Sequence, residues 1–475
     1  MDTKKLRQKI LDLAIRGKLV PQDPNDEPAS VLLERIRTEK ERLIKEGKIK
    51  RSKKSASDTP HYENEVLFEV PESWECCHVS DIFELNPKNN VPDDTQSGFI
   101  PMACVDDGFG YAHSFETRPW GEIRKGYSHF QNGDIGIAKI SPCFENRKST
   151  IFYDLPNGIG AGTTELTVLR GHCVNIEFYL YLFQSEWYVF EGTKEFKGVV
   201  GQQRVNKEIF TTLFIPLPPI EEQNRIVTEI KKWFSLIDTL ETAKEDLQES
   251  IAQAKSKILD LAIHGRLVPQ DLNDEPAIEL LRRINPKFTP CDNAHYENVP
   301  FEIPKSWRWT CMAEVNEYNS ASVDPSKSPD IDFELYSVPA YETGMPEFVK
   351  GKDISSSKKV VTRNDILLCK INPHLNRAWI VSHYKENIPC LASSEWIIFR
   401  NSAICPQYLS FCFTSNYFKE LMLSNVSGVG GSLMRAQPAI VNKYLFPMPP
   451  IDEQCRIVAA IQEYYEILDS IIANL

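Results

Sequence analysis

The stretch KILDLAIRGKLVPQDPNDEPA spans residues 9–29, and KILDLAIHGRLVPQDLNDEPA spans residues 257–277. The two segments differ only at the pairs Arg16/His264, Lys18/Arg266 and Pro24/Leu272. One copy lies at the start of the chain and the other lies in its middle. Because an internal repeat governs the architecture of a chain, this doubled stretch is the first guide to the fold.

Further segments repeat in the same order in both halves. HYENEVLFEVPESW (61–74) matches HYENVPFEIPKSW (295–307), and IPLPPIEEQNRIV (215–227) matches FPMPPIDEQCRIV (446–458). Two weaker matches are GDIGIAKISPCFENR (133–147) with NDILLCKINPHLNR (364–377), and TTELTVLR (163–170) with SSEWIIFR (393–400). The chain therefore contains a duplicated unit whose ends are shared and whose middles diverge in sequence.

The order of the repeats is circular. The central PLPPIEEQ motif leads through a long periodic segment to the second ILDLAI stretch, whereas the chain stops soon after the C-terminal PMPPIDEQ motif. The N-terminal residues supply the missing end of that copy. We expect the two terminal pieces to form together what residues 219–277 form alone. This predicts a pseudo-twofold axis and two termini that lie close together.

The periodic segment predicts one long helix over residues 221–264. Prolines precede it at 218–219, and Gly265 and Pro269 follow it as stop signals. At ~1.5 Å per residue it would be roughly 65 Å long. An apolar stripe of coiled-coil spacing requires a partner, and we expect the composite of 452–473 and 4–16 to lie antiparallel to it. The alternative is that each helix packs on its own domain. The stripe comprises Ile230, Phe234, Ile237, Leu240, Leu247, Ile251, Ala254, Ile258 and Leu261.

Two globular segments, 62–218 and 296–449, lie between the helical pieces. Each is rich in short β-type runs separated by Gly, Pro, Asn and Asp, and each ends in a helical stretch. The predicted fold class is α+β, with two mixed α/β domains joined by long antiparallel coiled-coil helices. The β-type runs are 98–104, 134–140, 149–155, 165–170, 332–341, 358–371, 378–384 and 395–400, and the helical stretches are 176–192 and 406–423.

Composition limits the class of protein. The 475 residues carry a formal net charge of −12, which argues against coating nucleic acid by bulk charge but permits a basic face. The start MDTKKLRQK is no secretory signal, and no apolar run is long enough to span a bilayer. The twelve cysteines include no CxxC pair, which favours reduced thiols. We expect a cytoplasmic protein.

In layout and motifs the chain resembles the specificity (S) subunits of Type I restriction-modification systems. The resemblance rests on the doubled PPIEEQ and PPIDEQ motifs, the ILDLAI stretches and the circular repeat. It implies that 62–218 and 296–449 are target-recognition domains, each reading one half of a bipartite, asymmetric DNA target. It implies that the helical regions 1–45, 219–290 and 450–475 space these domains. The implied partners are double-stranded DNA, two modification (methyltransferase) subunits and restriction (translocase/nuclease) subunits.

No catalytic motif stands out in the sequence. SPCF (141–144) and INPH (371–374) lack the form of an amino-methyltransferase loop, and GIGAG (158–162) and GVGG (428–431) are interpreted as flexible loops. EFK (195–197) is interpreted as a helix end, and there is no P-loop and no metal-ligand spacing of histidines. We expect a non-catalytic chain without its own cofactor or metal. The resemblance places S-adenosylmethionine, ATP and Mg on the partner subunits.

Candidate DNA-binding residues are polar side chains suited to base edges or phosphates. The first group follows a repeated β-type run and comprises Lys139, Ser141, Asn146, Arg147 and Lys148, matched by Lys370, Asn372, His374, Asn376 and Arg377. The second group lies in or beside Gly-rich loops and comprises Gln202, Gln203 and Arg204, with Arg435 and Gln437. Hydroxyls at 163–164 and 393–394 suit phosphate, whereas Glu165 and Glu395 are interpreted as structural.

Three alternatives remain open on sequence alone. The polar groups are also typical of ordinary surface loops. The basic run within residues 34–54, which is absent from the second half, is either a solvated linker or an arm for DNA or a partner. The whole chain is alternatively a self-contained methyltransferase or nuclease, or a coiled-coil adaptor for proteins. Carboxylates at 221–222 and 452–453 have a structural explanation, because they suit a helix N-terminus.

Overall fold

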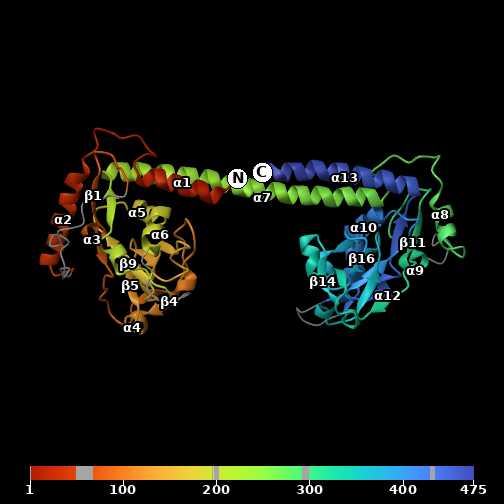
Figure 1. Cartoon of the computed structure of the whole chain (residues 1–475). Coiled ribbons are helices and arrows are strands. Elements are labelled where there is room, and N and C mark those ends of the chain that lie inside the picture. The colour runs from red at the N-terminus through yellow and green to blue at the C-terminus, as the bar shows by residue number, and fades with distance from the viewer. Residues whose placement is uncertain are drawn as a thin grey trace. The chain divides into compact units, whose positions relative to one another are not determined.

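The computed structural model describes residues 2–49, 68–194, 196, 203–290, 299–427 and 434–474. The chain divides into two compact units, Met1–Ala243 and Lys244–Leu475, and each unit mixes helices with strands (Figure 1). The mixed α+β class predicted from the sequence is thus confirmed. None of the described helices is long and apolar enough to cross a membrane.

The first unit begins with helices and continues into a β-rich domain. Its helices are α1 (Thr3–Ile15), α2 (Ala29–Lys45), α3 (Val79–Ile82), α4 (Trp120–Ile123), α5 (Ile176–Phe183), α6 (Glu186–Thr193) and the first half of α7 (Ile220–Ile263). Its strands are β1 (Glu75–His78), β2 (Phe83–Leu85), β3 (Gln96–Ile100), β4 (Glu116–Pro119), β5 (Ser128–Gln131), β6 (Ile135–Ala138), β7 (Ser149–Ile151), β8 (Ile159–Gly162), β9 (Leu166–Gly171) and β10 (Phe214–Leu217).

The second unit has a similar sequence of elements. Its helices are the second half of α7, α8 (Ala277–Ile284), α9 (Met312–Val315), α10 (Pro406–Thr414), α11 (Asn416–Ser424), α12 (Pro438–Val441) and α13 (Ile451–Ala473). Its strands are β11 (Arg308–Cys311), β12 (Ser322–Val323), β13 (Asp332–Tyr336), β14 (Glu347–Lys350), β15 (Lys358–Val361), β16 (Ile366–Cys369), β17 (Ala378–Ile380), β18 (Cys390–Ala392), β19 (Trp396–Phe399), β20 (Val426–Ser427), β21 (Arg435–Ala436) and β22 (Leu445–Met448).

The two β-rich domains share their strand order although their sequences diverge. In the first unit one sheet has the order β4-β3-β8-β5 and another has β2-β9-β6-β7. The second unit repeats the first sheet as β14-β13-β18-β15, with β12 added, and repeats three of the four strands of the other sheet, β9-β6-β7, as β19-β16-β17. The central pairs β3·β8 and β13·β18 are both parallel. A common scaffold therefore carries two different sets of loops and surface residues.

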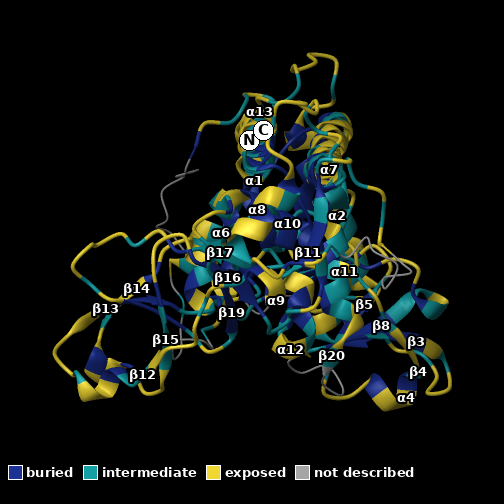
Figure 2. Cartoon of the chain, turned by 90° about the vertical axis from the view of Figure 1, so that its right-hand side faces the viewer, coloured by how far each residue is buried: buried dark blue, intermediate teal, exposed yellow. Residues whose placement is uncertain are grey.

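The core of each unit joins the helices to the sheets. In the first unit one hydrophobic cluster includes Ile10 of α1, Leu180 of α5 and Ile230 of α7. In the second unit the matching cluster includes Leu409 of α10 and Ile457 of α13. Figure 2 shows buried residues along the strands, for example at β8, and on α10. Burial of this apolar surface is the main term that holds the helices to their domain.

The repeated motifs of the first unit meet in a buried polar contact. Glu222, at the start of α7, is fully buried and accepts a hydrogen bond from the indole Nε1 of Trp74 at 2.8 Å. Its other oxygen accepts from Gln22 Nε2 at 2.6 Å. One turn on, Arg225 pairs with Asp26 at 2.6 Å. The N-terminal VPQDPND stretch is thereby fastened to the central PPIEEQ motif.

The second unit repeats this contact with the other copies of the motifs. Trp307 Nε1 donates to buried Glu453 at 2.8 Å, and Gln270 donates to the other oxygen of Glu453. Arg456 pairs with Asp274 at 2.6 Å. The central VPQDLND stretch is thus fastened to the C-terminal PPIDEQ motif. These contacts explain why the chain carries the same stretch twice, because each copy binds the N-terminal end of one long helix, α7 or α13, within its own unit.

An antiparallel helix pair forms in each unit. In the first, Arg7 of α1 bridges to Glu241 of α7 at 3.0 Å, while the far ends meet at the contact between Gln22 and Glu222 (Figure 1). In the second, Lys255 of α7 bridges to Asp469 of α13 at 2.5 Å. Within each unit, α7 therefore has the helical partner that the apolar stripe requires.

The stripe is not buried over its whole length, which corrects the expectation of a continuous seam. Ile230, Phe234 and Ile237 are buried in the first unit, and Ile251 is buried in the second. Leu240 is 49% exposed, however, and Leu247 is 36% exposed. In the first unit the partner helix α1 begins at Thr3, and Arg7 of that helix already lies opposite Glu241. Little of α1 therefore remains to cover the middle of α7.

Each expected long helical stretch is broken into two helices at a buried serine. Ser185 separates α5 from α6 and accepts a hydrogen bond from the backbone N–H of Tyr188 at 3.2 Å. Ser415 separates α10 from α11 and accepts from the N–H of Phe418 at 3.3 Å. A serine at this position caps a new helix N-terminus, so the chain turns where the apolar pattern alone predicts continuity.

The segment GIGAG (158–162), interpreted above as a flexible loop, is mostly strand β8 at the centre of a sheet. A Cβ atom added to Gly160 would lie 2.5 Å from the carbonyl oxygen of Gly98, and one added to Gly162 would lie 2.2 Å from that of Ile100. Glycine is therefore needed for close backbone packing here, and the loop interpretation was wrong. GVGG (428–431), Glu195 and Lys197 lie outside the described residues.

Candidate nucleic-acid interface

Three segments predicted to contact DNA meet in the first unit. The segment that follows β6 pairs with the segment 203–205, because Ser141 N–H donates to the carbonyl of Gln203 and Val205 N–H donates to that of Lys139, each at 2.9 Å. Lys139 N–H also donates to the carbonyl of Glu165 at 2.9 Å. Residues 139–148, 163–165 and 203–204 therefore form one surface region.

The second unit brings the matching segments together in the same register. Asn372 N–H donates to the carbonyl of Met434, and Ala436 N–H donates to that of Lys370, each at 2.8 Å. Lys370 N–H donates to the carbonyl of Glu395 at 3.1 Å. Isolated β-bridges pair Ile140 with Arg204 and Ile371 with Arg435. We call these two regions the first and second loop clusters, after their units.

A charged contact lies at the centre of each loop cluster. Glu165 accepts from Nε of Arg204 at 3.0 Å and from Nη2 at 2.7 Å. Glu395 accepts from Nη2 of Arg435 at 3.1 Å, and Lys370 Nζ lies 3.8 Å from its second oxygen. The Arg204 guanidinium holds the pKa of Glu165 below its usual range. Glu165 and Glu395 thus bind the two arginines that the sequence assigned to DNA.

Some predicted contact residues are already bonded inside their domains. Arg147 donates from Nε to the carbonyl of Gln184 at 3.0 Å, lies over the ring of Phe109, and has its pKa lowered by burial. Asn376 donates its side-chain amide to the carbonyl of Thr414. Arg147 thereby binds the C-terminal end of α5, and Asn376 binds the C-terminal end of α10. Arg377 is likewise nearly buried and donates to the carbonyl of Ile371 at 3.2 Å.

Other predicted residues remain at the surface of the loop clusters. Asn146 is exposed in the first unit, and His374 and Gln437 are exposed in the second. Lys148 lies 3.4 Å from Asp107, and Ser141 donates to Glu145 at 2.6 Å. Gln202 lies outside the described residues. So does most of the basic run at 48–54, of which only the first two residues are described.

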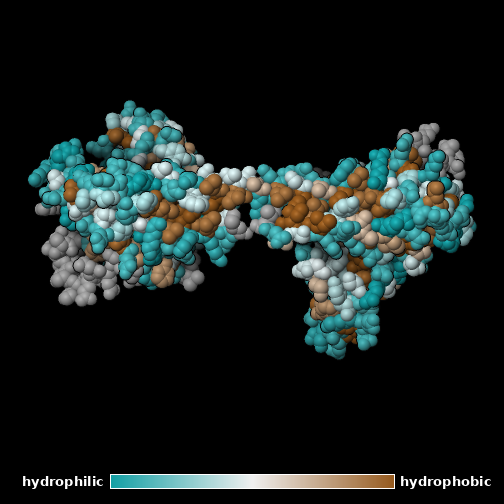
Figure 3. All heavy atoms as spheres, turned by 90° about the horizontal axis from the view of Figure 1, so that it is seen from above, coloured by the Kyte–Doolittle hydropathy of each residue, from teal (hydrophilic) through white to brown (hydrophobic). Residues whose placement is uncertain are grey.

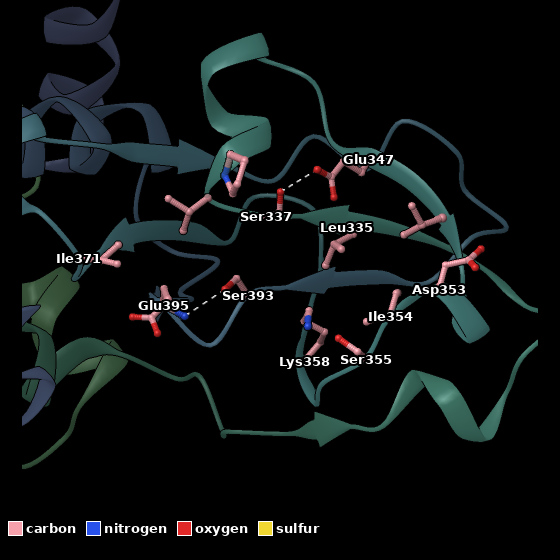
Figure 4. Close-up of a pocket in the computed structure, with 13 residues that line it drawn as sticks. Leu335, Ser337, Glu347, Asp353, Ile354, Ser355, Lys358, Ile371, Ser393 and Glu395 are labelled. Carbon is pink, nitrogen blue, oxygen red and sulfur yellow. Dashed lines mark hydrogen bonds between the residues drawn. The ribbon is translucent and has the colours of Figure 1, made fainter. Parts of the chain in front are cut away.

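Sequence reasoning missed a hollow beside the second loop cluster. The hollow has a volume of about 390 Å³. Figure 4 shows Ser393 and Glu395 at one end of it and Asp353 and Ile354 at the other. Ser337 donates to Glu347 at 3.0 Å within it. Ser393 and Glu395 belong to the repeated SSEWIIFR motif, whereas the rest of the lining comes from β13, β14 and neighbouring loops and forms no contiguous motif. The hollow presents both apolar and hydrogen-bonding groups next to Arg435.

Comparison with known proteins places this geometry in a family. The chain is 34% identical to the specificity subunit of the Type I restriction enzyme EcoEI from Escherichia coli, over 99% of this chain and 90% of that protein. It is 35% identical to the EcoAI specificity subunit from Escherichia coli, over 97% and 88% of the two chains. Residues 71–249 match the family model described as "Type I restriction modification DNA specificity domain". The chain belongs to the specificity subunits of Type I restriction enzymes.

Solved structures agree with the fold of this specificity subunit. A chain from a study titled "Structural basis underlying complex assembly and conformational transition of the type I R-M system" has a TM-score of 0.57 at 16% identity. That match covers 86% of this chain and 94% of the other. The HsdS subunit from Thermoanaerobacter tengcongensis has a TM-score of 0.50 at 15% identity, over 86% and 93% of the two chains. At such identities the likeness concerns the fold alone.

Membership decides the broad function. The protein is the specificity subunit of a Type I restriction-modification system, and its recognition domain is of the DNA-specificity type. The comparisons give the curated relatives as specificity subunits, in agreement with the resemblance found in the sequence. Among the residues that the structure describes, no group of His, Cys, Asp and Glu side chains is arranged to hold a metal ion.

Proposed function

We propose that each β-rich domain of this specificity subunit reads one half of a bipartite, asymmetric DNA target through its loop cluster. The observation that supports this most strongly is the shared arrangement of the two loop clusters on one scaffold, with different residues at their surfaces. Ser141 and Gln203 stand in the first cluster where Asn372 and Met434 stand in the second. A common frame with unequal side chains suits two unequal half-sites.

The proposed contact surface is narrower than the sequence prediction. It retains Lys139, Asn146, Gln203 and Arg204 in the first unit, together with Gln202, which lies outside the described residues. In the second it retains Lys370, Asn372, His374, Arg435 and Gln437. Arg147, Asn376 and Arg377 are left out because their donors are already bonded within the domain. Ser141 and Lys148 are secondary candidates, because the hydroxyl of Ser141 donates its one proton to Glu145 and the side chain of Lys148 is only 15% exposed beside Asp107.

The proposed boundaries assign 62–218 and 296–449 to the two target-recognition domains. The helical regions 1–45, 219–290 and 450–475 would then set the distance between half-sites. The circular repeat supports an arrangement in which α1 and α13 together form the antiparallel partner of α7 around a pseudo-twofold axis. Two readers on such a spacer would contact half-sites about one helical turn of DNA apart.

The same helices are proposed to dock two modification subunits. Trp233, Leu236 and Leu240 of α7 are between 41% and 49% exposed and follow three- and four-residue spacing, which places them on one side of the helix. Figure 3, viewed from above, shows hydrophobic residues, in brown, at the surface along the helices of each unit. An exposed apolar face of this kind is typical of a protein interface.

In this proposal the chain is non-catalytic and carries no cofactor. S-adenosylmethionine, ATP and Mg would be bound by the modification and restriction subunits, which assemble with this chain on DNA in the cytoplasm. The glycine-rich segment 158–162 supports this assignment, because its backbone lies within a sheet and is not free to wrap a cofactor.

Base-resolved mapping of DNA methylation tests the proposal. Genomic DNA would be taken from cells that express this chain with its modification subunit, and from cells that lack this chain. We expect a split, asymmetric methylated motif that disappears without the chain. If an assembled complex gives no new motif, the protein would be an adaptor and not a reader. Binding of S-adenosylmethionine to the isolated chain would contradict the non-catalytic assignment.

A further inference from the structure

The pairing of an arginine with a carboxylate is duplicated at the centre of both loop clusters. We propose that Glu165 and Glu395 are specificity-determining residues, which orient Arg204 and Arg435 toward base edges and restrain them from binding phosphates at random. This inference rests on the proposed function, because it requires the loop clusters to face DNA. The carboxylates are positioning residues, since they act through the arginines.

The backbone of both glutamates is held in a hydrogen-bonded turn. The N–H of Glu165 donates to Oγ1 of Thr163 at 3.2 Å, and its carbonyl accepts from Lys139 at 2.9 Å. The N–H of Glu395 donates to Oγ of Ser393 at 3.3 Å, and its carbonyl accepts from Lys370 at 3.1 Å. The Thr-Thr-Glu and Ser-Ser-Glu turns therefore fix the backbone position from which each glutamate side chain reaches its arginine. A fixed partner lowers the entropic cost of holding a long arginine side chain in one orientation.

The geometry in the first unit leaves one edge of the guanidinium for a ligand. Glu165 occupies Nε and one N–H of Nη2, whereas Nη1 of Arg204 has no hydrogen-bond partner in the described part of the chain. The side chain of Arg204 is 52% exposed, and that of Arg435 is 51% exposed. The remaining N–H groups of such a guanidinium suit the O6 and N7 acceptors of guanine in the major groove.

The charge of the carboxylate also matters for non-specific binding. An arginine near DNA binds any phosphate and displaces counterions, which adds affinity without information about sequence. A carboxylate beside the arginine offsets this attraction. The base-dependent hydrogen bonds then make up a larger share of the affinity. Glu165 and Glu395 therefore lower the total affinity for DNA and raise the discrimination between DNA sequences.

The test compares Glu165→Gln, Glu395→Gln and a control in the assembled complex with the modification subunits. The control is Glu275→Gln, because Glu275 forms a similar two-bond pair with exposed Arg283, at 2.7 and 2.6 Å, away from the loop clusters. Dissociation constants would be measured over a range of salt concentrations. One DNA duplex carries the motif mapped by methylation, and the other carries the same bases in shuffled order.

We expect Glu165→Gln and Glu395→Gln each to tighten binding of the shuffled duplex several-fold and to steepen its salt dependence, by about 0.9 in slope for one added phosphate contact. The ratio of affinities for the two duplexes should fall about tenfold, within the range of one bidentate base contact. Glu275→Gln should change neither quantity. In an Arg204→Gln background, Glu165→Gln should have no further effect.

Glu165→Asp provides a second test, because it keeps the charge and shortens the side chain. It should leave the salt slope unchanged and still lower the affinity ratio. If Glu165→Gln fails to fold, the affinity ratio of Glu165→Asp still tests the inference. The inference is overturned if these variants leave the ratio at the wild-type value while the wild-type chain directs a methylated motif. Absence of any motif from the wild-type complex would instead overturn the proposed function.

Discussion

At the scale of single residues, the buried contact between Trp74 and Glu222 predicts a pH-dependent loss of stability. Trp74→Phe keeps a ring but removes the N–H that binds Glu222. Burial raises the pKa of Glu222, and the bond from Trp74 opposes that rise. We expect the variant to lower the free energy of unfolding by about 1–3 kcal/mol, because a buried carboxylate loses a donor. Denaturant unfolding measures this loss.

The pH dependence has a definite sign. The loss is greatest where Glu222 is charged in the folded chain, and it shrinks as pH falls through the raised pKa and the carboxyl group becomes protonated. Trp307→Phe should show the same pH-dependent loss of stability, because Trp307 binds Glu453 and burial raises the pKa of Glu453 as well. Trp187→Phe is the control, since its indole nitrogen is buried without a hydrogen-bond partner among the described residues. A loss independent of pH in Trp74→Phe would contradict this account.

Several site residues were predictable because they occur at equivalent positions in both copies of the repeat. Lys139 and Lys370 follow matching strands, and the structure places both beside a glutamate of the matching turn. The inward bonds of Arg147 and Asn376 were not predictable, because they depend on where helices α5 and α10 end in space. The bond from Trp74 to Glu222 joins residues 148 positions apart, and no local pattern reveals it.

At the scale of elements, the exposed face of α7 makes a prediction about assembly. The double variant Leu236→Ser, Leu240→Ser removes two leucines that are 48% and 49% exposed. The unfolding free energy of the isolated chain should change by less than about 0.5 kcal/mol per site, as for other surface substitutions. Binding to the modification subunit should weaken at least tenfold, about 1.4 kcal/mol, because the interface loses apolar contacts. Titration calorimetry measures this affinity.

The matched control for this experiment is Leu272→Ser. Leu272 is fully exposed, at 100%, and lies in the VPQDLND stretch, which follows the end of α7. The control should assemble with unchanged affinity. Equal weakening by Leu272→Ser, or wild-type affinity of the double variant, would show that this face of α7 is not the docking surface.

The continuous long helix was predicted more reliably than the breaks within shorter elements. The long helix predicted over 221–264 is found as Ile220–Ile263, because its apolar spacing and its proline and glycine boundaries agree. The run 358–371 was read as one β-type segment, but the structure divides it into β15 and β16. Asp365 causes the division, since its carboxylate accepts the N–H of Thr362 at 2.8 Å and closes a turn. The four polar residues TRND (362–365) between two apolar runs are the sequence signal of this turn.

At the scale of the whole molecule, the duplicated frame predicts that recognition domains are exchangeable. In the first unit, β1 pairs with β10, so that Glu75 lies opposite Leu217 at the two ends of the domain. In the second, β11 pairs with β22, and Arg308 lies opposite Met448. In each unit the chain therefore enters and leaves the recognition domain through two short strands that pair with each other. Replacing residues 75–217 with the matching segment of a relative leaves the contact of Trp74 with Glu222 in place.

The central claim is that one chain carries two independent readers, and methylation mapping of this exchanged chain tests it most directly. The exchanged chain and the parent would each be expressed with the modification subunit, and the methylated motifs would be compared base by base. The account predicts that one half of the split motif changes, while the other half and the gap stay the same. A motif that changes in both halves, or in neither, would contradict the account.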